Sequence, residues 1–168
     1  MTLHGYRVHA LVDPARRFVH ELPVRIESFY QTLARRDAKI STIISSHGFD
    51  TGVSVLVEGR LPSRISLEKQ DRIRTLLDTA RPLTATLEHL QYGTKRASEE
   101  PVAPRLRGQS DAFKAALTAF IDDLRMTLWK ENVLNPENHA ALERFQTQVN
   151  GSVMHISTVV TATERLKL

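Results

Sequence analysis

Two helical patterns that meet at Asn135-Pro136 constrain the fold of this chain more than any other feature of its sequence. Asparagine is a good N-cap, and proline suits the first helical position because its missing N–H would have no partner there. Upstream, residues 110–131 begin with Ser110, a candidate N-cap, and carry an apolar stripe at helical spacing. That stripe consists of Phe113, Leu117, Phe120, Ile121, Leu124 and Leu128. The pattern predicts two antiparallel amphipathic helices joined by a short turn.

The far end of the second helix has two interpretations. An apolar stripe continues at helical spacing through Leu142, Phe145, Val149, Val153, Ile156, Val160 and Thr163. Against this, Asn150-Gly151 is a strong turn signal, and residues 152–163 are rich in Val, Ile and Thr, which favours a strand. We expect the continuous helix, because the stripe keeps its phase across the glycine and one helical glycine costs only about 1 kcal/mol. The alternative is an α+β fold with a third strand at 152–163.

The first half of the chain holds two segments in which apolar and polar residues alternate. Residues 5–12 place Tyr6, Val8, Ala10 and Val12 on one face, and residues 52–58 do the same with three valines. Alternation with period two is typical of a strand. We expect these segments to pair as a small two-stranded β element.

The rest of the first half has helical character. Asp13-Pro14 predicts a short helix over 14–22 that ends or bends at Pro23. A helical stripe then follows from Val24 and is interrupted at Asp37, and another helix is expected from Ser66, bent at Pro82. The predicted fold is therefore mainly α, a bundle of about five helices with a small β element.

Residues 93–109 are the best candidate for a flexible linker. They contain two glycines, two prolines and few apolar side chains to anchor the backbone. This divides the chain into a part at 1–92 and a helical hairpin at 110–168, which we expect to form one domain overall because 168 residues suit a single core.

Composition excludes several classes of protein. The chain has no cysteine, which rules out disulfides, thiolate metal sites and thiol nucleophiles. The sequence has no run of about 18 apolar residues, which a membrane span would require. The first residues lack the pattern of a signal peptide. We therefore expect a cytoplasmic protein with no membrane partner.

A search for catalytic chemistry finds no motif. The seven histidines are scattered, and none forms a spacing typical of metal ligands. The seven glycines match neither a P-loop nor a dinucleotide fingerprint, and no serine sits in a nucleophile elbow. We expect no cofactor, no metal and no catalytic residue, although a site assembled in space can escape sequence reading.

Positive charge is concentrated in the first half. The formal net charge is +4, and residues 1–84 carry 13 basic against 9 acidic side chains. Arginine binds phosphate through its planar donor fork, so Arg60, Arg64, Arg72 and Arg74 are weak candidates for contacts with nucleic-acid backbone. Nearby acidic residues offer the alternative that these arginines are neutralised within the protein.

A second, weaker apolar stripe on the helix at 110–131 suggests a partner surface. It ends in Met126, Trp129 and Val133, which are residue types that commonly anchor protein interfaces. The leading hypothesis is a non-catalytic interaction or adaptor subunit that binds a protein partner or a second copy of itself. The alternative is an accessory nucleic-acid-binding protein that uses the arginines of the first half.

Overall fold

The computed structural model of the chain describes residues 3–47, 49, 67–92 and 101–168, and at 3–9, 45 and 67–74 it describes the backbone alone. These residues form α1 (Leu3–Arg36), α2 (Ala38–Ser46), α4 (Leu67–Tyr92), α5 (Val102–Lys130) and α6 (Pro136–Arg165). The described ranges contain no strand. The mainly helical prediction is thus confirmed, and the small two-stranded element is not seen.

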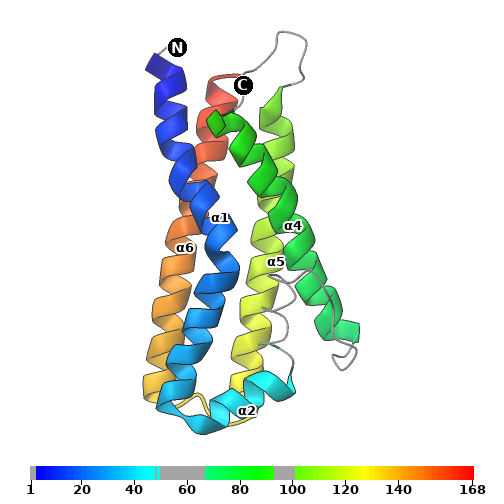
Figure 1. Cartoon of the computed structure of the whole chain (residues 1–168), viewed down its shortest axis with the longest axis vertical. Helices are drawn as coiled ribbons and strands as arrows, with labels where there is room; N and C mark the ends of the chain where they lie inside the picture. The colour runs from blue at the N-terminus through cyan, green and yellow to red at the C-terminus, as the bar shows by residue number, and fades with distance from the viewer. Residues whose placement is uncertain (1–2, 48, 50–66, 93–100) are drawn as a thin grey trace.

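The four long helices form a bundle and run alternately down and up (Figure 1). Each of them packs against two others, since both α1 and α5 contact α4 and α6. This closed order is the up-down-up-down topology of a four-helix bundle. The short α2 follows the lower end of α1 and packs against it (Figure 1).

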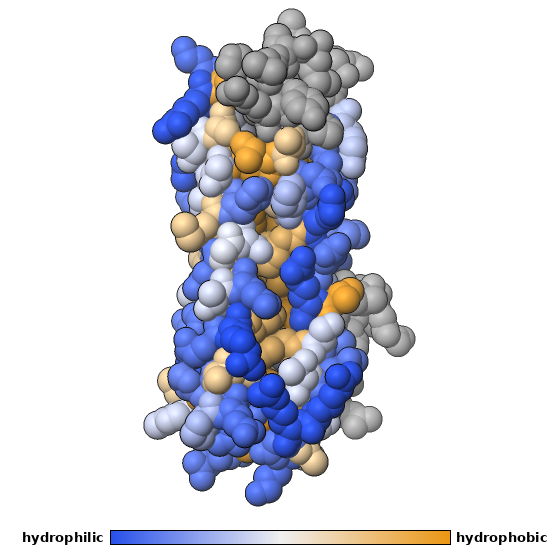
Figure 2. Space-filling model, turned by 90° about the vertical axis from the view of Figure 1, so that its left-hand side faces the viewer, coloured by the Kyte–Doolittle hydropathy of each residue, from blue (hydrophilic) through white to orange (hydrophobic). Residues whose placement is uncertain are grey.

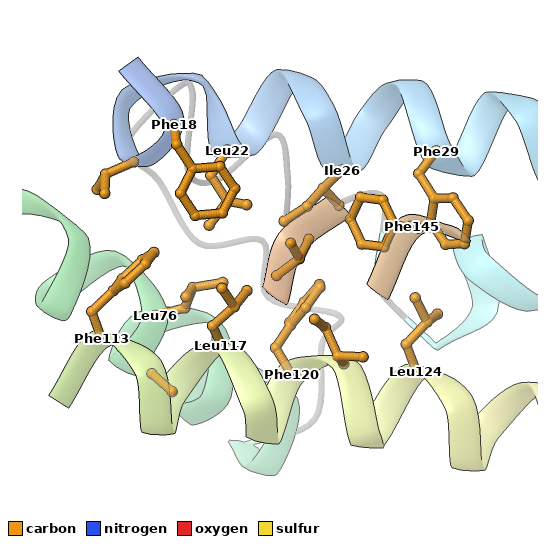
Figure 3. Close-up of a cluster of buried hydrophobic side chains, with 14 of the residues drawn as sticks. Phe18, Leu22, Ile26, Phe29, Leu76, Phe113, Leu117, Phe120, Leu124 and Phe145 are labelled. Atoms are coloured by element: carbon orange, nitrogen blue, oxygen red, sulfur yellow. The ribbon is translucent and has the colours of Figure 1, made fainter. Parts of the chain in front are cut away.

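Aromatic rings from three helices meet in the interior (Figure 3). Phe18 of α1 and Phe113 of α5 pack edge to face with ring centroids 6.4 Å apart. Phe29 of α1 stacks on Phe145 of α6 at 4.3 Å. Each such pair contributes about 0.5–1.5 kcal/mol beyond its area burial. The rings therefore help to hold α1 against α5, across the bundle, and against α6 beside it.

The hairpin at Asn135-Pro136 is confirmed. α5 ends at Lys130, Asn132 has a left-handed φ of 58°, and α6 begins at Pro136. The Asn135 side chain accepts a hydrogen bond from the backbone N–H of Asn138 at 2.9 Å, so it caps α6 as expected. The left-handed residue reverses the chain and lets a short turn join the two helices.

The continuous helix is also confirmed, because α6 runs unbroken to Arg165 and no strand forms at 152–163. Gly151 lies on the exposed side of α6, and no atom lies within 4 Å of the place where its Cβ would be. Val149, Ile156 and Val160 are buried on either side of it. Burial of this stripe outweighs the cost of about 1 kcal/mol for the glycine.

α5 begins earlier than expected. It starts at Val102, so the expected linker at 93–109 is helical in its last part, while 93–100 lie outside the described residues. Ser110 is buried within the helix and does not cap it. The first N–H groups of α5, those of Val102 and Ala103, donate instead to the carbonyl of Leu168, at 2.9 and 3.1 Å. A cap from the far end of α6 replaces the local one that the sequence suggested.

The strand expected at 5–12 is wrong, because residues 3–36 form one helix. Pro14 and Pro23 lie inside it and do not bound a short helix over 14–22. Each interior proline removes a backbone hydrogen bond and costs about 3 kcal/mol. A buried stripe at helical spacing crosses both prolines, and each large side chain in it contributes about 1.5–3 kcal/mol. The stripe consists of Val12, Ala15, Val19, Leu22, Ile26, Phe29 and Leu33.

The remaining expectations for the first half have mixed outcomes. Asp37 does separate two helices, and its carboxylate accepts a hydrogen bond from the N–H of Lys39 at 3.0 Å. α4 begins at Leu67, beside the expected Ser66, and continues through Pro82. The strand expected at 52–58 lies outside the described residues. Within the described ranges, no helix is both long and apolar enough to cross a bilayer.

Candidate functional site

The three residues proposed as a partner surface separate into two environments. Met126 and Trp129 are exposed, with 50% and 65% of their surface accessible. Val133 is buried among the core side chains. It lies beyond the end of α5, where the chain reverses at Asn132 and the N–H of Val133 donates to the carbonyl of Leu128 at 3.2 Å. The turn therefore directs Val133 inward, and only Met126 and Trp129 face solvent.

Met126 and Trp129 belong to a helix face that carries one exposed charge between the exposed residues Asp111 and Lys130, which bound it. We call it the α5 outer face, and it comprises the exposed positions of α5 between 112 and 129: Ala112, Ala115, Thr118, Ala119, Asp122, Met126 and Trp129. Asp122 is the single charged residue among them. Exposed helical surfaces usually carry long charged side chains, so a face of alanines with a tryptophan and a methionine is unusual.

The two basic residues between positions 112 and 129, Lys114 and Arg125, are half-buried and contact α6. Arg125 donates a hydrogen bond to Gln146 and lies 3.7 Å from Asp122 and 3.8 Å from Glu143. Lys114 donates to the hydroxyl of Ser157. These contacts hold both cations at the boundary between the α5 outer face and α6.

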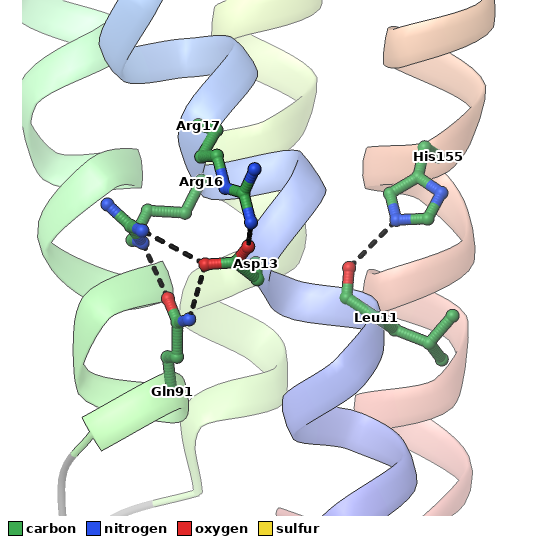
Figure 4. A network of polar contacts seen from close by, with 6 residues as sticks. All are labelled: Leu11, Asp13, Arg16, Arg17, Gln91 and His155. Carbon is green, nitrogen blue, oxygen red and sulfur yellow. Dashed lines mark hydrogen bonds and ion pairs between the residues drawn. The ribbon is translucent and has the colours of Figure 1, made fainter.

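A polar network joins the N-terminal half of α1 to the C-terminal end of α4 (Figure 4). The Asp13 carboxylate accepts hydrogen bonds from Gln91 at 2.6 Å and Arg16 at 3.0 Å, and it pairs with Arg17. The bonds from Gln91, Arg17 and Arg16 hold the pKa of Asp13 well below its ordinary value, and Asp13 in turn raises the pKa of Arg16. Arg16 also lies over the ring of Tyr92. The network ties two helices together and holds its charges in fixed places.

Two grooves flank α1 on either side. One, of about 520 Å³, lies between α1 and α4 and is lined mainly by apolar residues, with His20, Arg81 and Glu88 among its polar members. The other, of about 350 Å³, lies between α1 and α6. The exposed side chain of Val24 borders both.

The candidate nucleic-acid residues are not brought together by anything that the structure describes. Arg60 and Arg64 lie outside the described residues. Arg72 and Arg74 lie on α4, where only the backbone is described. Binding of nucleic acid through these four arginines stays a prediction.

The histidines form pairs with carboxylates in two places. His47 lies 3.2 Å from Glu131, and His139 lies 3.8 Å from Glu143. Within the described part of the chain, no three His, Asp or Glu side chains lie close enough together to hold a metal ion. Cofactor binding was not expected from the sequence, and no cofactor is assigned.

Comparisons with protein-family models, with curated proteins and with solved structures find no match for this chain. The function of the chain is therefore inferred from the geometry of its own surfaces. Sequence reasoning found the tryptophan and methionine of the α5 outer face but missed both grooves of α1. The grooves depend on which side chains face each other between helices far apart in sequence, and helical periodicity carries no signal for that.

Proposed function

We propose that the chain is a non-catalytic assembly subunit that associates with a second copy of itself through the α5 outer face. The observation that carries the proposal is the exposure of Met126 and Trp129 on a face otherwise made of small residues. Tryptophan is enriched at the centres of interfaces, because its large ring buries much apolar surface at a small cost in side-chain entropy. Alanines allow another helix to approach closely.

The distribution of side-chain sizes along the α5 outer face indicates that its partner is a second copy of the chain. Large side chains occupy its C-terminal half and alanines its N-terminal half. Trp129 and Ala115 are each seven residues, about two turns, from Asp122. A two-fold axis at Asp122 that pairs two α5 helices antiparallel places Trp129 of each copy over Ala115 of the other. Met126 then lies over Thr118 and Ala119. The face is thus complementary to itself, as a two-fold interface requires.

The same axis brings the two Asp122 carboxylates together. Their repulsion opposes association, and Arg125, at 3.7 Å from Asp122 within each copy, offsets part of it. This gives the proposed pairing a distinctive signature. Removing the Asp122 charge should strengthen the dimer, whereas most interface substitutions weaken one.

Sedimentation equilibrium of the purified chain tests the proposal. We expect a dimer with a Kd below roughly 100 µM, weakened about tenfold or more by Trp129→Ala or Ala115→Glu and strengthened by Asp122→Asn. Met154→Ala is the matched control, because Met154 is an exposed methionine on α6 and should leave the equilibrium unchanged.

Two results would overturn the proposal. One is a chain that stays monomeric to several hundred micromolar. The other is a dimer indifferent to both Trp129→Ala and Ala115→Glu. Far-ultraviolet circular dichroism of each variant shows whether the bundle is intact, so loss of folding is not mistaken for loss of the interface.

A further inference from the structure

The groove between α1 and α6 has an apolar floor. It lies on the side of the molecule that Figure 2 presents, where a band of apolar surface occupies a furrow between rows of hydrophilic side chains. The stacked rings of Phe29 and Phe145 form part of the floor, together with Phe18, Ala141 and Val149. The volume is about 350 Å³, which lies at the small end of the range for ligand pockets.

The rim of this groove is polar and cationic. Arg25 and Ser28 stand on the α1 side, and Arg144 and Gln148 stand on the α6 side. No carboxylate is among the residues that line the groove. Within the described part of the chain, the side chains of Arg144 and Gln148 have no hydrogen-bond or ion-pair partner.

Arg25 is partly engaged. Its guanidinium lies 3.3 Å from the carboxylate of Glu21, one turn earlier on α1, and 5.8 Å from the centre of the Phe18 ring. Glu21 therefore competes with any anion for Arg25. Arg144 carries no such competitor among the described residues, so it is the stronger anion ligand of the two.

We propose that this groove binds a small amphipathic carboxylate, with an apolar chain on the aromatic floor and the carboxylate held by Arg144. A guanidinium matches a carboxylate through two parallel N–H donors, and the amide of Gln148 supplies another donor beside it. The volume of about 350 Å³ suits a small ligand, and decanoate, with twelve non-hydrogen atoms, is a probe of that class.

Size selects this occupant over a protein segment. An α-helix with its side chains is about 10 Å across and would need a much longer and wider channel. The site also lies apart from the α5 outer face, since α1 and α6 form it, so its test is independent of self-association.

The experiment is a titration of the purified chain with decanoate. Binding is monitored by calorimetry and by the chemical shifts of backbone amides. We expect saturable one-to-one binding, with shifts at Ser28, Phe145 and Gln148. Affinity should fall about fourfold for each methylene removed, in nonanoate and then octanoate. The decyltrimethylammonium cation, which has the same apolar chain and opposite charge, should not bind.

Variants separate the role of the charge from that of the floor. Arg144→Gln should weaken decanoate binding by about tenfold or more. Glu21→Gln should tighten it, because Arg25 is then released. Ser28→Leu, at an exposed position on the rim, should abolish binding by filling the groove. Arg165→Gln is the control, as it removes an exposed arginine from the same helix but outside the groove.

Three results would overturn the proposal. The first is the absence of saturable decanoate binding up to about 5 mM. The second is equal binding of the carboxylate and the quaternary ammonium. The third is unchanged affinity in Arg144→Gln or in Ser28→Leu while the thermal midpoint of each variant shows that it is folded.

Discussion

Side-chain pairs bridge α5 and α6 at several levels, whereas a groove runs along each of the two interfaces of α1. Three pairs of side chains cross from α5 to α6: Arg107 with Glu164, Lys114 with Ser157, and Arg125 with Gln146. Between α1 and α6, the polar contacts of the described residues lie on either side of the groove. His155 meets the Leu11 carbonyl at 2.8 Å, and Arg36 meets the Glu137 carbonyl at 3.4 Å.

The two interfaces differ in the side chains that face each other at their rims. Each pair across α5 and α6 joins a cation to a carboxylate, a hydroxyl or an amide oxygen. Across α1 and α6, the middle of the interface sets Arg25 opposite Arg144, and two cations repel and cannot bridge. Cation-to-oxygen pairs thus bridge α5 and α6, and no such pair spans the groove between α1 and α6 among the described residues.

The largest expected effect comes from the floor of the groove between α1 and α6. Phe145→Ala should lower the free energy of unfolding by about 3–5 kcal/mol, because it removes the ring stacked on Phe29 and leaves a cavity. Urea denaturation measures this. Phe145→Leu keeps most of the volume and should lose much less. A loss below about 1 kcal/mol for Phe145→Ala would mean that the floor does not hold α1 to α6.

A smaller effect on the free energy of unfolding is expected at the turn that joins α5 to α6. Asn138 is buried, and its side-chain amide donates to the carbonyl of Val133 at 2.9 Å. Asn138→Ala should cost about 1–3 kcal/mol, since it leaves that carbonyl without its donor. Asn150→Ala, at an exposed asparagine on the same helix, should stay within about 0.5 kcal/mol of the parent chain. Equal effects of the two variants would show that the turn contributes nothing special.

The smallest expected effect on stability concerns the polar network around Asp13, which joins α1 to α4, and it depends on pH. Hydrogen bonds from Gln91, Arg17 and Arg16 hold the pKa of Asp13 below its ordinary 3.8. A carboxyl with a lowered folded-state pKa stabilises the protein above its unfolded pKa, and that stability is lost as the pH falls toward the folded value. Asp13→Asn should therefore be less stable than the parent at pH 6, and the gap should narrow below about pH 4.

Parallel stability curves for the parent chain and Asp13→Asn would contradict this account. Gln91→Leu removes the contact that lowers the pKa of Asp13 most, so it should also reduce the dependence on pH. Denaturation at a series of pH values measures all three proteins.

Local signals in the sequence predicted the hairpin well, because its determinants are local. Asn135 caps α6 through a residue three positions away, and the apolar stripes of both helices match their buried faces. The start of α5 could not be predicted in the same way, since its first N–H groups are capped by Leu168 at the other end of the chain.

The first half was predicted less well, because local preference there opposed tertiary packing. Pro14 and Pro23 are strong signals for helix ends, and residues 5–12 alternate like a strand. The stripe that passes through Val12, Leu22 and Ile26 is buried along the bundle and overrides these signals. Of the candidate surface, Met126 and Trp129 are exposed as the interface hypothesis requires, but their role in binding stays a proposal.

Trp129 is the single tryptophan of the chain and lies 65% exposed at the end of α5. Its fluorescence therefore reports on one surface of the native protein and is nearly insensitive to changes in the core. Tryptophan emission should differ little between folded and unfolded monomers. A melting curve followed by this emission would therefore show only a small change, even where the protein unfolds cooperatively. The same insensitivity makes the signal selective, because a blue shift in the folded protein would report that something has covered this end of the helix.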